Sequence, residues 1–507
     1  MSGHVIMVQG TTSHAGKSIL VAALCRIFAR QGLRVAPFKA QNMALNSYVT
    51  PEGGELGRAQ AYQAQAAGIE PHVDMNPVLL KPNSQTGSQV IVLGKPLGNM
   101  SVREYHAFQP TVWPTVTAAL DRLRAEYDLV VIEGAGSPAE INLRDQDIVN
   151  MKVARYAGCP VLLVGDIDRG GVFASLVGTT LLVTEEERAL IKGFVINKFR
   201  GDASLLDNGL TWLHDYTGIP TLGVIPYLKD WRGDEEDSLG VEDRRKQRKH
   251  QAALTLTVVR LPFISNYTDF DALADEEDVA VRYADTPVEL AGADALLLPG
   301  TKSTVADLHW LRTSGMAEPL LRLVADGTPV VGICGGYQML GKQIFDPYAV
   351  ESDEPEIAGL GLLDTQTTFA ADKRTIRAAG TLTGAGLGVA GTPVYGYEIH
   401  MGRTTRAAQV EPLLHLADAQ GDELFDGGVS ADGLVCGTYL HGLFDHPVLR
   451  RGWLNRLRAR KQLPPLPIHE DVVSDIDRLA NHVAAHLDLS AVEAMIGLDG
   501  DATVMER

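Results

Sequence analysis

The sequence predicts two α/β domains joined by a charged linker, the first of them built on a parallel sheet. The chain has 507 residues, which is too long for a single hydrophobic core, because a domain usually holds roughly 100–200 residues. Short apolar runs alternate with segments of helical composition in both halves, as expected for buried parallel strands joined by helices. Between the halves lies a stretch dense in charge, with an acidic run at 234–237 and a basic run at 244–249. This composition is typical of a linker or of a solvated surface loop.

The predicted strands fall into two series. The first series is predicted at residues 5–8, 35–38, 129–132, 161–164, 194–196 and 221–224, with helical segments at 18–30 and 56–67. The second series is predicted at residues 254–259, 295–298, 330–333 and 434–439. From about residue 451 the composition is helical and is interrupted by prolines at 464, 465 and 467. We therefore predict domains at 1–228 and 253–450, a linker at 229–252, and a helical extension of the second domain at 451–507.

Composition and charge narrow the classes of partner. The net charge of −18 argues against nucleic acid, because phosphate backbones need a basic protein face, but it leaves anionic substrates open. The N-terminus lacks the pattern of a signal peptide, and no apolar run reaches the ~18 residues of a membrane span. The cysteines form no Cys-x-x-Cys pair, so neither a zinc site nor a disulfide framework is indicated; they are Cys25, Cys159, Cys334 and Cys436. We therefore expect a cytoplasmic protein without a membrane or nucleic-acid partner.

A phosphate-binding loop is predicted directly after the first strand. The sequence Gly10-Thr11-Thr-Ser-His-Ala-Gly16-Lys17-Ser18 lies between a strand and a helix, which is the context such a loop requires. Its glycines let backbone N–H groups turn towards phosphate oxygens, Lys17 is expected to contact the outer phosphates, and Ser18 is expected to bind Mg²⁺. The loop is one residue longer than the usual motif. A chance glycine-rich turn is the weaker interpretation, because strand, loop, Gly-Lys-Ser and helix occur together.

Polar side chains follow other strands of the first half. Glu133 ends an apolar strand and is a second candidate Mg²⁺ ligand, since open α/β sheets bind ligands at the carboxyl ends of their strands. Lys39 is expected to face the same crevice and to stabilise charge on a transferred phosphoryl group. Asp166 begins the run Asp-Ile-Asp-Arg-Gly-Gly, which suits a metal–phosphate loop or an ordinary βα turn about equally. Asn197 and Lys198 end the next strand and are weaker candidates for contacting the nucleotide.

A nucleophilic cysteine is predicted in the second half. Cys334 lies at a turn between a strand and a helix and is followed by two glycines, as in a nucleophile elbow with cysteine in place of serine. The helix N-terminus favours thiolate, and the amide of Gly335 together with the strand end at Gly300 could form an oxyanion hole. His441 follows a late strand and is the candidate base. The third, orienting group is open: Glu398 and Asp445 are candidates, each with a structural alternative. An inert buried thiol is the other interpretation of Cys334.

These motifs resemble two known families. The second half resembles class I glutamine amidotransferases of the cobyrinate-type branch, which lack the usual glutamate two residues after the histidine, as this chain does at Leu443. The first half resembles dethiobiotin synthetase, whose phosphate loop has the same extra residue and whose later strand also ends in Glu-Gly-Ala-Gly. The resemblance covers nearly the whole chain and implies a P-loop-type domain followed by a class I glutamine amidotransferase-like domain.

Two corrinoid enzyme families combine these halves. Cobyrinic acid a,c-diamide synthases have Gly-Pro-Asp after the Phe-Lys of the second strand, whereas here Lys39 is followed by Ala-Gln-Asn-Met-Ala-Leu-Asn-Ser. This segment resembles cobyric acid synthases, as do the motifs at 57–60, 80–82, 166–171 and 265–270. The aspartate missing from the segment is a metal ligand in the dethiobiotin synthetase pattern, and Gln41 or Asn42 is its expected replacement.

The resemblance implies a reaction. Cobyric acid synthases use Mg²⁺–ATP and glutamine to amidate the b, d, e and g carboxylates of adenosylcobyrinic acid a,c-diamide in cobalamin biosynthesis, through an acyl phosphate and a cysteine thioester. The alternatives are a related ligase, such as the a,c-diamide synthase, and a non-catalytic P-loop partner or scaffold protein. The segment after Lys39 argues against the former, and a scaffold has no need of a cysteine elbow with a strand-end histidine. Whether the chain forms a homo-oligomer stays open.

Overall fold

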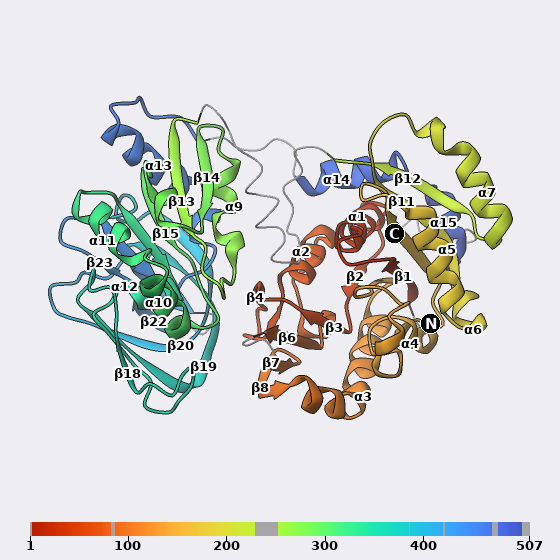
Figure 1. Cartoon of the computed structure of the whole chain (residues 1–507), viewed down its shortest axis with the longest axis horizontal. Coiled ribbons are helices and arrows are strands. Elements are labelled where there is room, and N and C mark those ends of the chain that lie inside the picture. Colours follow the sequence, from red (N-terminus) through yellow and green to blue (C-terminus); the bar gives the residue numbers. More distant parts are fainter. Residues whose placement is uncertain are drawn as a thin grey trace. The chain divides into compact units, whose positions relative to one another are not determined.

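The computed structural model describes residues 3–82, 87–228, 252–384, 386–418, 421–468 and 475–498. The chain divides into two compact units (Figure 1). Unit 1 comprises Met1–Ala44, Glu55–Glu236 and Val472–Arg507, and unit 2 comprises Leu45–Gly54 and Asp237–Asp471. The predicted linker at 229–252 lies, apart from its last residue, outside the described residues.

Unit 1 is built on a six-stranded parallel sheet with the order β12-β11-β10-β1-β9-β2. Every strand predicted in this half is confirmed, and the bounds are β1 (His4–Gly10), β2 (Val35–Phe38), β9 (Leu129–Glu133), β10 (Val161–Asp166), β11 (Ile191–Phe199) and β12 (Thr221–Pro226). Successive side chains of a strand point to opposite faces of the sheet. In β1, Met7 packs in one core and Val8 in the other, so both faces are covered and the strand sequences are apolar throughout.

Helices follow the strands of unit 1. Their bounds are α1 (Lys17–Arg30), α2 (Arg58–Ala67), α3 (Val102–Glu126), α4 (Met151–Ala157), α5 (Val172–Leu182), α6 (Glu185–Arg188) and α7 (Asp207–Thr217). A second, smaller sheet with the order β3-β6-β7-β8 was not predicted; its strands are β3 (Gln41–Met43), β6 (Val78–Pro82), β7 (Gly87–Val92) and β8 (Lys95–Ser101). The helix predicted from residue 56 begins at Arg58, because Leu56 lies in the short strand β5 (Glu55–Gly57).

The C-terminal helices α14 (Asp475–Ala484) and α15 (Leu489–Ile496) belong to unit 1. We predicted them as an extension of the second domain, and the structure differs. Helix α14 buries Leu479 and Val483 in the same core as α1, and Asp477 forms an ion pair with Arg26 at 2.7 Å. The apolar face of α1 that points away from the sheet therefore needs these helices as its cover.

Unit 2 contains a six-stranded sheet with the order β14-β13-β15-β16-β24-β23, parallel except for the edge strand β23. Its bounds confirm all four predicted strands: β13 (Leu254–Val259), β14 (Val279–Ala284), β15 (Ala295–Leu298), β16 (Val330–Ile333), β23 (Gly428–Val429) and β24 (Val435–Thr438). The helices are α9 (Asp271–Asp275), α10 (Thr304–Thr313), α11 (Ala317–Ala325), α12 (Gly335–Leu340) and α13 (Pro447–Arg460). The sequence thus correctly predicts two α/β units with parallel sheets.

A second sheet of unit 2 was not predicted. It is formed by β17 (Gln343–Phe345), β18 (Glu356–Ala358), β19 (Thr365–Leu382), β20 (Pro393–Arg406), β21 (Leu414–Asp418) and β22 (Glu423–Asp426). The long antiparallel pair β19–β20 dominates it. Within the part of the chain that the structure describes, no helix combines the length and apolar character needed to cross a membrane.

Candidate active sites

The phosphate loop of unit 1 has the geometry that its sequence predicts. Gly16 has φ +95°, and a Cβ at this position would lie 2.0 Å from Asn197 Nδ2, so only glycine fits. Lys17 opens α1 and is buried, and its Nζ donates to the carbonyl oxygens of Thr12 and Gly136, each at 3.1 Å. The lysine therefore lies across the loop, between it and the turn that follows β9.

Glu133 lies at the centre of a buried polar cluster beside the loop. Its Oε1 accepts from Ser18 Oγ at 2.8 Å and from Lys39 Nζ at 3.0 Å, and its Oε2 accepts from Gln63 Nε2. Burial by itself would raise the pKa of this carboxyl, but the Lys39 charge and the hydrogen bonds hold the pKa below its ordinary value. The structure thus brings Ser18, Lys39 and an ionised Glu133 together. Gln63, on α2, was not predicted from the sequence.

The other predicted residues of this half lie on the far side of the loop. Asn197 Nδ2 donates to the Ala15 carbonyl at 3.0 Å, and Lys198 Nζ donates to the His14 carbonyl at 2.7 Å. Lys198 also forms an ion pair with Asp166 at 3.2 Å. These contacts hold the backbone of the loop in place. A contact of Asn197 or Lys198 with the nucleotide stays a prediction.

The donors present suit a magnesium ion bound together with phosphates. Mg²⁺ is usually held by one or two protein oxygens, with phosphate and water oxygens completing the octahedron. Ser18 and Glu133 supply such oxygens, whereas Asp166 pairs with Lys198 instead. Among the described residues, no group of three His, Cys, Asp or Glu side chains forms a site of its own for a metal. A role for Asp166 in binding metal stays a prediction.

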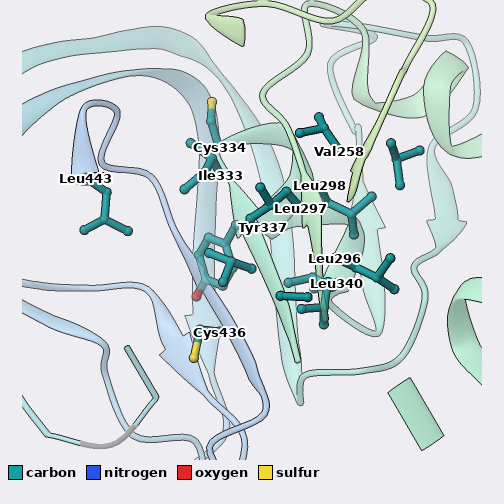
Figure 2. Close-up of a cluster of buried hydrophobic side chains, with 14 of the residues drawn as sticks. Val258, Leu296, Leu297, Leu298, Ile333, Cys334, Tyr337, Leu340, Cys436 and Leu443 are labelled. Atoms are coloured by element: carbon teal, nitrogen blue, oxygen red, sulfur yellow. The ribbon is translucent and has the colours of Figure 1, made fainter. Parts of the chain in front are cut away.

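Cys334 lies at a strained turn between β16 and α12. Its φ of +53° is in the left-handed region, which non-glycine residues rarely adopt. The turn closes because its neighbours lack side chains: a Cβ at Gly336 would lie 2.1 Å from the Leu298 carbonyl oxygen, and one at Gly332 would lie 2.7 Å from Leu340 Cδ1. Figure 2 shows Cys334 next to Ile333, at the opposite end of the labelled cluster from Cys436. This backbone is that of a nucleophile elbow.

The two glycines predicted for an oxyanion hole lie close to this turn. A Cβ at Gly335 would lie 3.2 Å from the backbone nitrogen of Thr301, and a Cβ at Gly300 would lie 3.1 Å from His441 Cε1. The Cys334 N–H is engaged elsewhere, because it donates to the Thr438 carbonyl at 2.8 Å. Gly300 and Gly335 thus flank the predicted nucleophile and base, and their role in binding an oxyanion stays a prediction.

His441 is held by a carboxylate that the sequence analysis missed. The Asp269 Oδ2 lies 2.8 Å from His441 Nδ1, and its Oδ1 accepts the N–H of Gly442 at 2.9 Å. The ring is fully buried and stacks on Tyr397 with centroids 5.3 Å apart. Burial by itself lowers the pKa of the imidazole, but the Asp269 charge and hydrogen bonds with Asp269 and Cys334 raise it to about 10. Asp269 is thus placed to orient the ring of His441, while the roles of Cys334 as nucleophile and His441 as base stay predictions.

The described contacts place Glu398 away from His441. This glutamate lies on β20, where its Oε2 accepts from Arg374 Nε at 2.8 Å and lies 3.2 Å from His400 Nε2. Asp445 lies in the turn after His441, but Asp269 is the carboxylate at the ring nitrogen. The structure thus shows contacts of Glu398 with Arg374 and His400, and not the contact with His441 that the sequence analysis expected. The reason is topological: β20 belongs to the second sheet, whereas Asp269 follows β13 of the sheet that carries Cys334 and His441.

The sequence held a signal for Asp269. The segment 265–270 was used only as a family motif, yet it follows β13, a strand of the parallel sheet that also contains β16 and β24. Carboxyl ends of parallel strands meet at one edge, so a carboxylate there was a candidate partner for His441. Its distance of 172 residues from His441 hid the pairing.

Comparisons with known proteins match both halves of the chain. A model described as the CobB/CobQ-like glutamine amidotransferase domain matches residues 255–448, and one described as the CobQ/CobB/MinD/ParA nucleotide binding domain matches residues 6–239. A cobyric acid synthase of Dehalococcoides mccartyi (strain CBDB1) is 51% identical over 498 residues, which cover 97% of this chain and 98% of the relative. A cobyric acid synthase of Sorangium cellulosum (strain So ce56) is 52% identical over 518 residues, covering 98% and 100%. The chain belongs to the cobyric acid synthase family.

Membership of the cobyric acid synthase family confirms several predictions together. The chain is a glutamine amidotransferase and a carbon–nitrogen ligase, with a nucleotide-binding first domain. The family also decides between the corrinoid alternatives left open above, because the long matches are to cobyric acid synthases. Cys334, His441 and Asp269 lie within the matched amidotransferase domain, and Lys17, Ser18 and Glu133 lie within the matched nucleotide-binding domain.

Proposed function

We propose that this chain uses ATP and glutamine to amidate the b, d, e and g carboxylates of adenosylcobyrinic acid a,c-diamide in cobalamin biosynthesis. Similarity to cobyric acid synthases along the whole chain supports the substrate. The observation that carries the chemistry is that one chain holds both a Cys334–His441–Asp269 series and a phosphate loop beside Glu133. Free, buried cysteines support a reducing compartment such as the cytoplasm.

The nucleotide-binding half activates the carboxylate. A carboxylate does not react with ammonia at neutral pH, because its leaving group would be oxide; transfer of the ATP γ-phosphoryl group to it gives an acyl phosphate with a good leaving group. In this role Lys17 and Lys39 stabilise negative charge on the phosphoryl group. Ser18 and Glu133 are the residues that would hold Mg²⁺, which neutralises phosphate charge when bound.

The amidotransferase half releases ammonia. Cys334 attacks the carboxamide carbon of glutamine, and His441 donates a proton to the departing ammonia and then activates water to hydrolyse the thioester. Asp269 holds the Nδ1 side of the ring, so the other ring nitrogen is the one that exchanges protons at Cys334. Ammonia then attacks the acyl phosphate, which releases inorganic phosphate and leaves the amide.

Product stoichiometry tests this proposal. We expect one ADP, one phosphate and one glutamate for each amide formed, measured by chromatography of the nucleotides and amino acids in one reaction. Omitting the corrinoid should lower the rate of ADP release. Formation of AMP and pyrophosphate instead would contradict the acyl phosphate, since it indicates an acyl adenylate.

Asp269→Asn should lower the turnover of glutamine by about 10³–10⁴-fold, because the ring loses the charge that stabilises imidazolium and an amide beside Nδ1 can hold the wrong tautomer. The pKa of His441 is raised to about 10, so the protonated ring persists up to that pH. The stabilisation from its pairing with Asp269 is full below the unfolded pKa of 6.5 and is lost as the pH rises through about 10. The basic limb of the pH profile of glutamate release should therefore move to lower pH in the variant.

Asp445→Asn is the matched control for this prediction. It makes the same change at the other carboxylate near His441 and should alter glutamate release by no more than about twofold. Amidation from added ammonia should persist in both variants. Full glutaminase activity in Asp269→Asn would remove Asp269 from the proposed series.

A further inference from the structure

A short segment from the first half of the sequence belongs to the amidotransferase unit. Leu45–Gly54 is part of unit 2, whereas Ala44 and Glu55 on either side of it belong to unit 1. We call Leu45–Gly54 the arm. It contains β4 (Ser47–Val49) and ends in a turn closed by hydrogen bonds between Thr50 and Gly54. The chain therefore leaves unit 1 at Ala44 and returns to it at Glu55, while the arm between these residues is part of unit 2.

The arm contacts the turn that presents Asp269. The N–H of Ser47 donates to Asn266 Oδ1 at 2.9 Å, and both residues are buried. Asn266 has φ +50°, a conformation that asparagine tolerates better than most residues. Its carbonyl accepts the N–H of Asp269 at 3.0 Å, at the start of the helical turn η4 (Tyr267–Phe270). The arm thus supports the carboxylate that binds His441.

The arm also contacts the residue stacked on His441. The Tyr48 ring meets Tyr397 edge-on with centroids 5.0 Å apart, and Tyr397 lies parallel to the His441 ring. The backbones of Tyr397 and His441 exchange two hydrogen bonds, at 2.8 and 3.2 Å. Displacing the Tyr48 ring would therefore change how Tyr397 packs on the face of the His441 ring.

A third contact lies beside the nucleophile. Val49 forms a small buried cluster with Tyr397 and Ile399, and its carbonyl accepts from Arg377 Nε at 2.8 Å. The carbonyl of Ile399 lies 3.5 Å from Cys334 Sγ. Three successive residues of the arm thus support the surroundings of Asp269, His441 and Cys334, although none of them takes part in the chemistry.

The segment that precedes the arm contacts α2, the helix that also reaches the buried polar cluster around Glu133. Asn42, three residues before the arm, is buried and donates to Gln60 Oε1 at 2.8 Å. Gln60 is on α2, the helix whose Gln63 donates to Glu133. A movement of α2 when the nucleotide site fills would therefore reach the arm through Asn42 and the chain itself.

We propose that the arm positions the Asp269–His441 pair and couples glutamine hydrolysis to the state of the nucleotide-binding half. The proposal rests on the proposed function. Ser47 and Tyr48 are positioning residues in this account, because they act through Asn266 and Tyr397. Since coupling between two sites is reciprocal in binding, glutamine should also tighten binding of the nucleotide and acceptor.

Glutamate release by the full chain tests the arm, measured with and without Mg²⁺–ATP plus adenosylcobyrinic acid a,c-diamide. We expect these ligands to stimulate the wild type by about tenfold and Tyr48→Ala to abolish most of the stimulation. The loss should fall on kcat rather than on KM for glutamine, because the arm does not touch the substrate. Asn266→Gly, which removes the acceptor but tolerates the positive φ, should have the same effect.

Controls separate positioning from loss of folding. Tyr48→Phe keeps the ring and should keep the stimulation, as should Tyr348→Ala, the same truncation at a tyrosine 71% exposed elsewhere in unit 2. Amidation from ammonia should persist in every variant. Wild-type stimulation in both Tyr48→Ala and Asn266→Gly, or a wild type that forms amide without being stimulated, overturns the arm proposal alone. A wild type that forms no amide from ammonia overturns the proposed function and, with it, this inference.

Discussion

Cys334→Ser is expected to abolish amidation from glutamine, lowering its rate by roughly 10⁴-fold or more, while amidation from added ammonia continues. A serine hydroxyl at neutral pH is a far weaker nucleophile than a cysteine thiolate, and the elbow is specialised for the residue at its apex. The nucleotide-binding half carries none of this chemistry, so an external supply of ammonia bypasses the defect. The measurement compares initial rates of amide formation with glutamine and with ammonium chloride near neutral pH.

Cys436→Ser is the matched control. Cys436 is a second free cysteine of the same unit and is also buried, but it lies at the opposite end of the cluster shown in Figure 2. Placing a hydroxyl there should lower stability without distinguishing between the two nitrogen sources. If Cys334→Ser lost both activities, Cys334 would be a structural residue and the proposed division of labour would be wrong.

Lys17→Ala is expected to impair activation of the carboxylate rather than the supply of ammonia. Amidation should fall by about 10²–10³-fold with either nitrogen source, because in the proposed mechanism the lysine stabilises charge on the transferred phosphoryl group. In the structure its Nζ donates to the carbonyl oxygens of Thr12 and Gly136, so the lysine lies at the loop where the phosphates are expected to bind. Hydrolysis of glutamine in the absence of ATP should remain, since Cys334 and His441 are untouched.

Lys192→Ala is the control for this variant, since Lys192 is an exposed lysine on β11 of the same unit. It should leave amidation unchanged. Equal loss of glutamine-dependent and ammonia-dependent synthesis in Lys17→Ala, against retention in Lys192→Ala, would assign the loss to the phosphate loop. An active Lys17→Ala enzyme would remove the loop from the mechanism.

Both sites could be predicted in part because their signals are local. The phosphate loop and the cysteine elbow each occupy a strand, a turn and a helix start, so glycines at fixed positions mark them in the sequence. The structure shows why these glycines are needed: a Cβ would collide with Asn197 at Gly16 and with the Leu298 carbonyl at Gly336. The strands of both parallel sheets were equally visible, since burial on both faces makes them apolar throughout.

The features that were missed depend on distant parts of the chain. Asp269 meets His441 only because β13 and β24 belong to one sheet, and no local pattern specifies that neighbourhood. Helices α14 and α15 have apolar faces that could cover either unit, and only packing against α1 decides which. The arm looked like part of the first domain because it lies there in sequence, whereas its contacts with Asn266 and Tyr397 place it in the second.

The most direct test of the central claim is mass spectrometry of adenosylcobyrinic acid a,c-diamide after incubation with the chain, Mg²⁺–ATP and amide-¹⁵N glutamine. The account predicts stepwise gain of up to four labelled amides, dependent on ATP, with label absent from the product of Cys334→Ser supplied with unlabelled ammonia. A corrinoid of unchanged mass, in a reaction where glutamate is still released, would contradict the substrate. Amides without label would contradict transfer of nitrogen from glutamine.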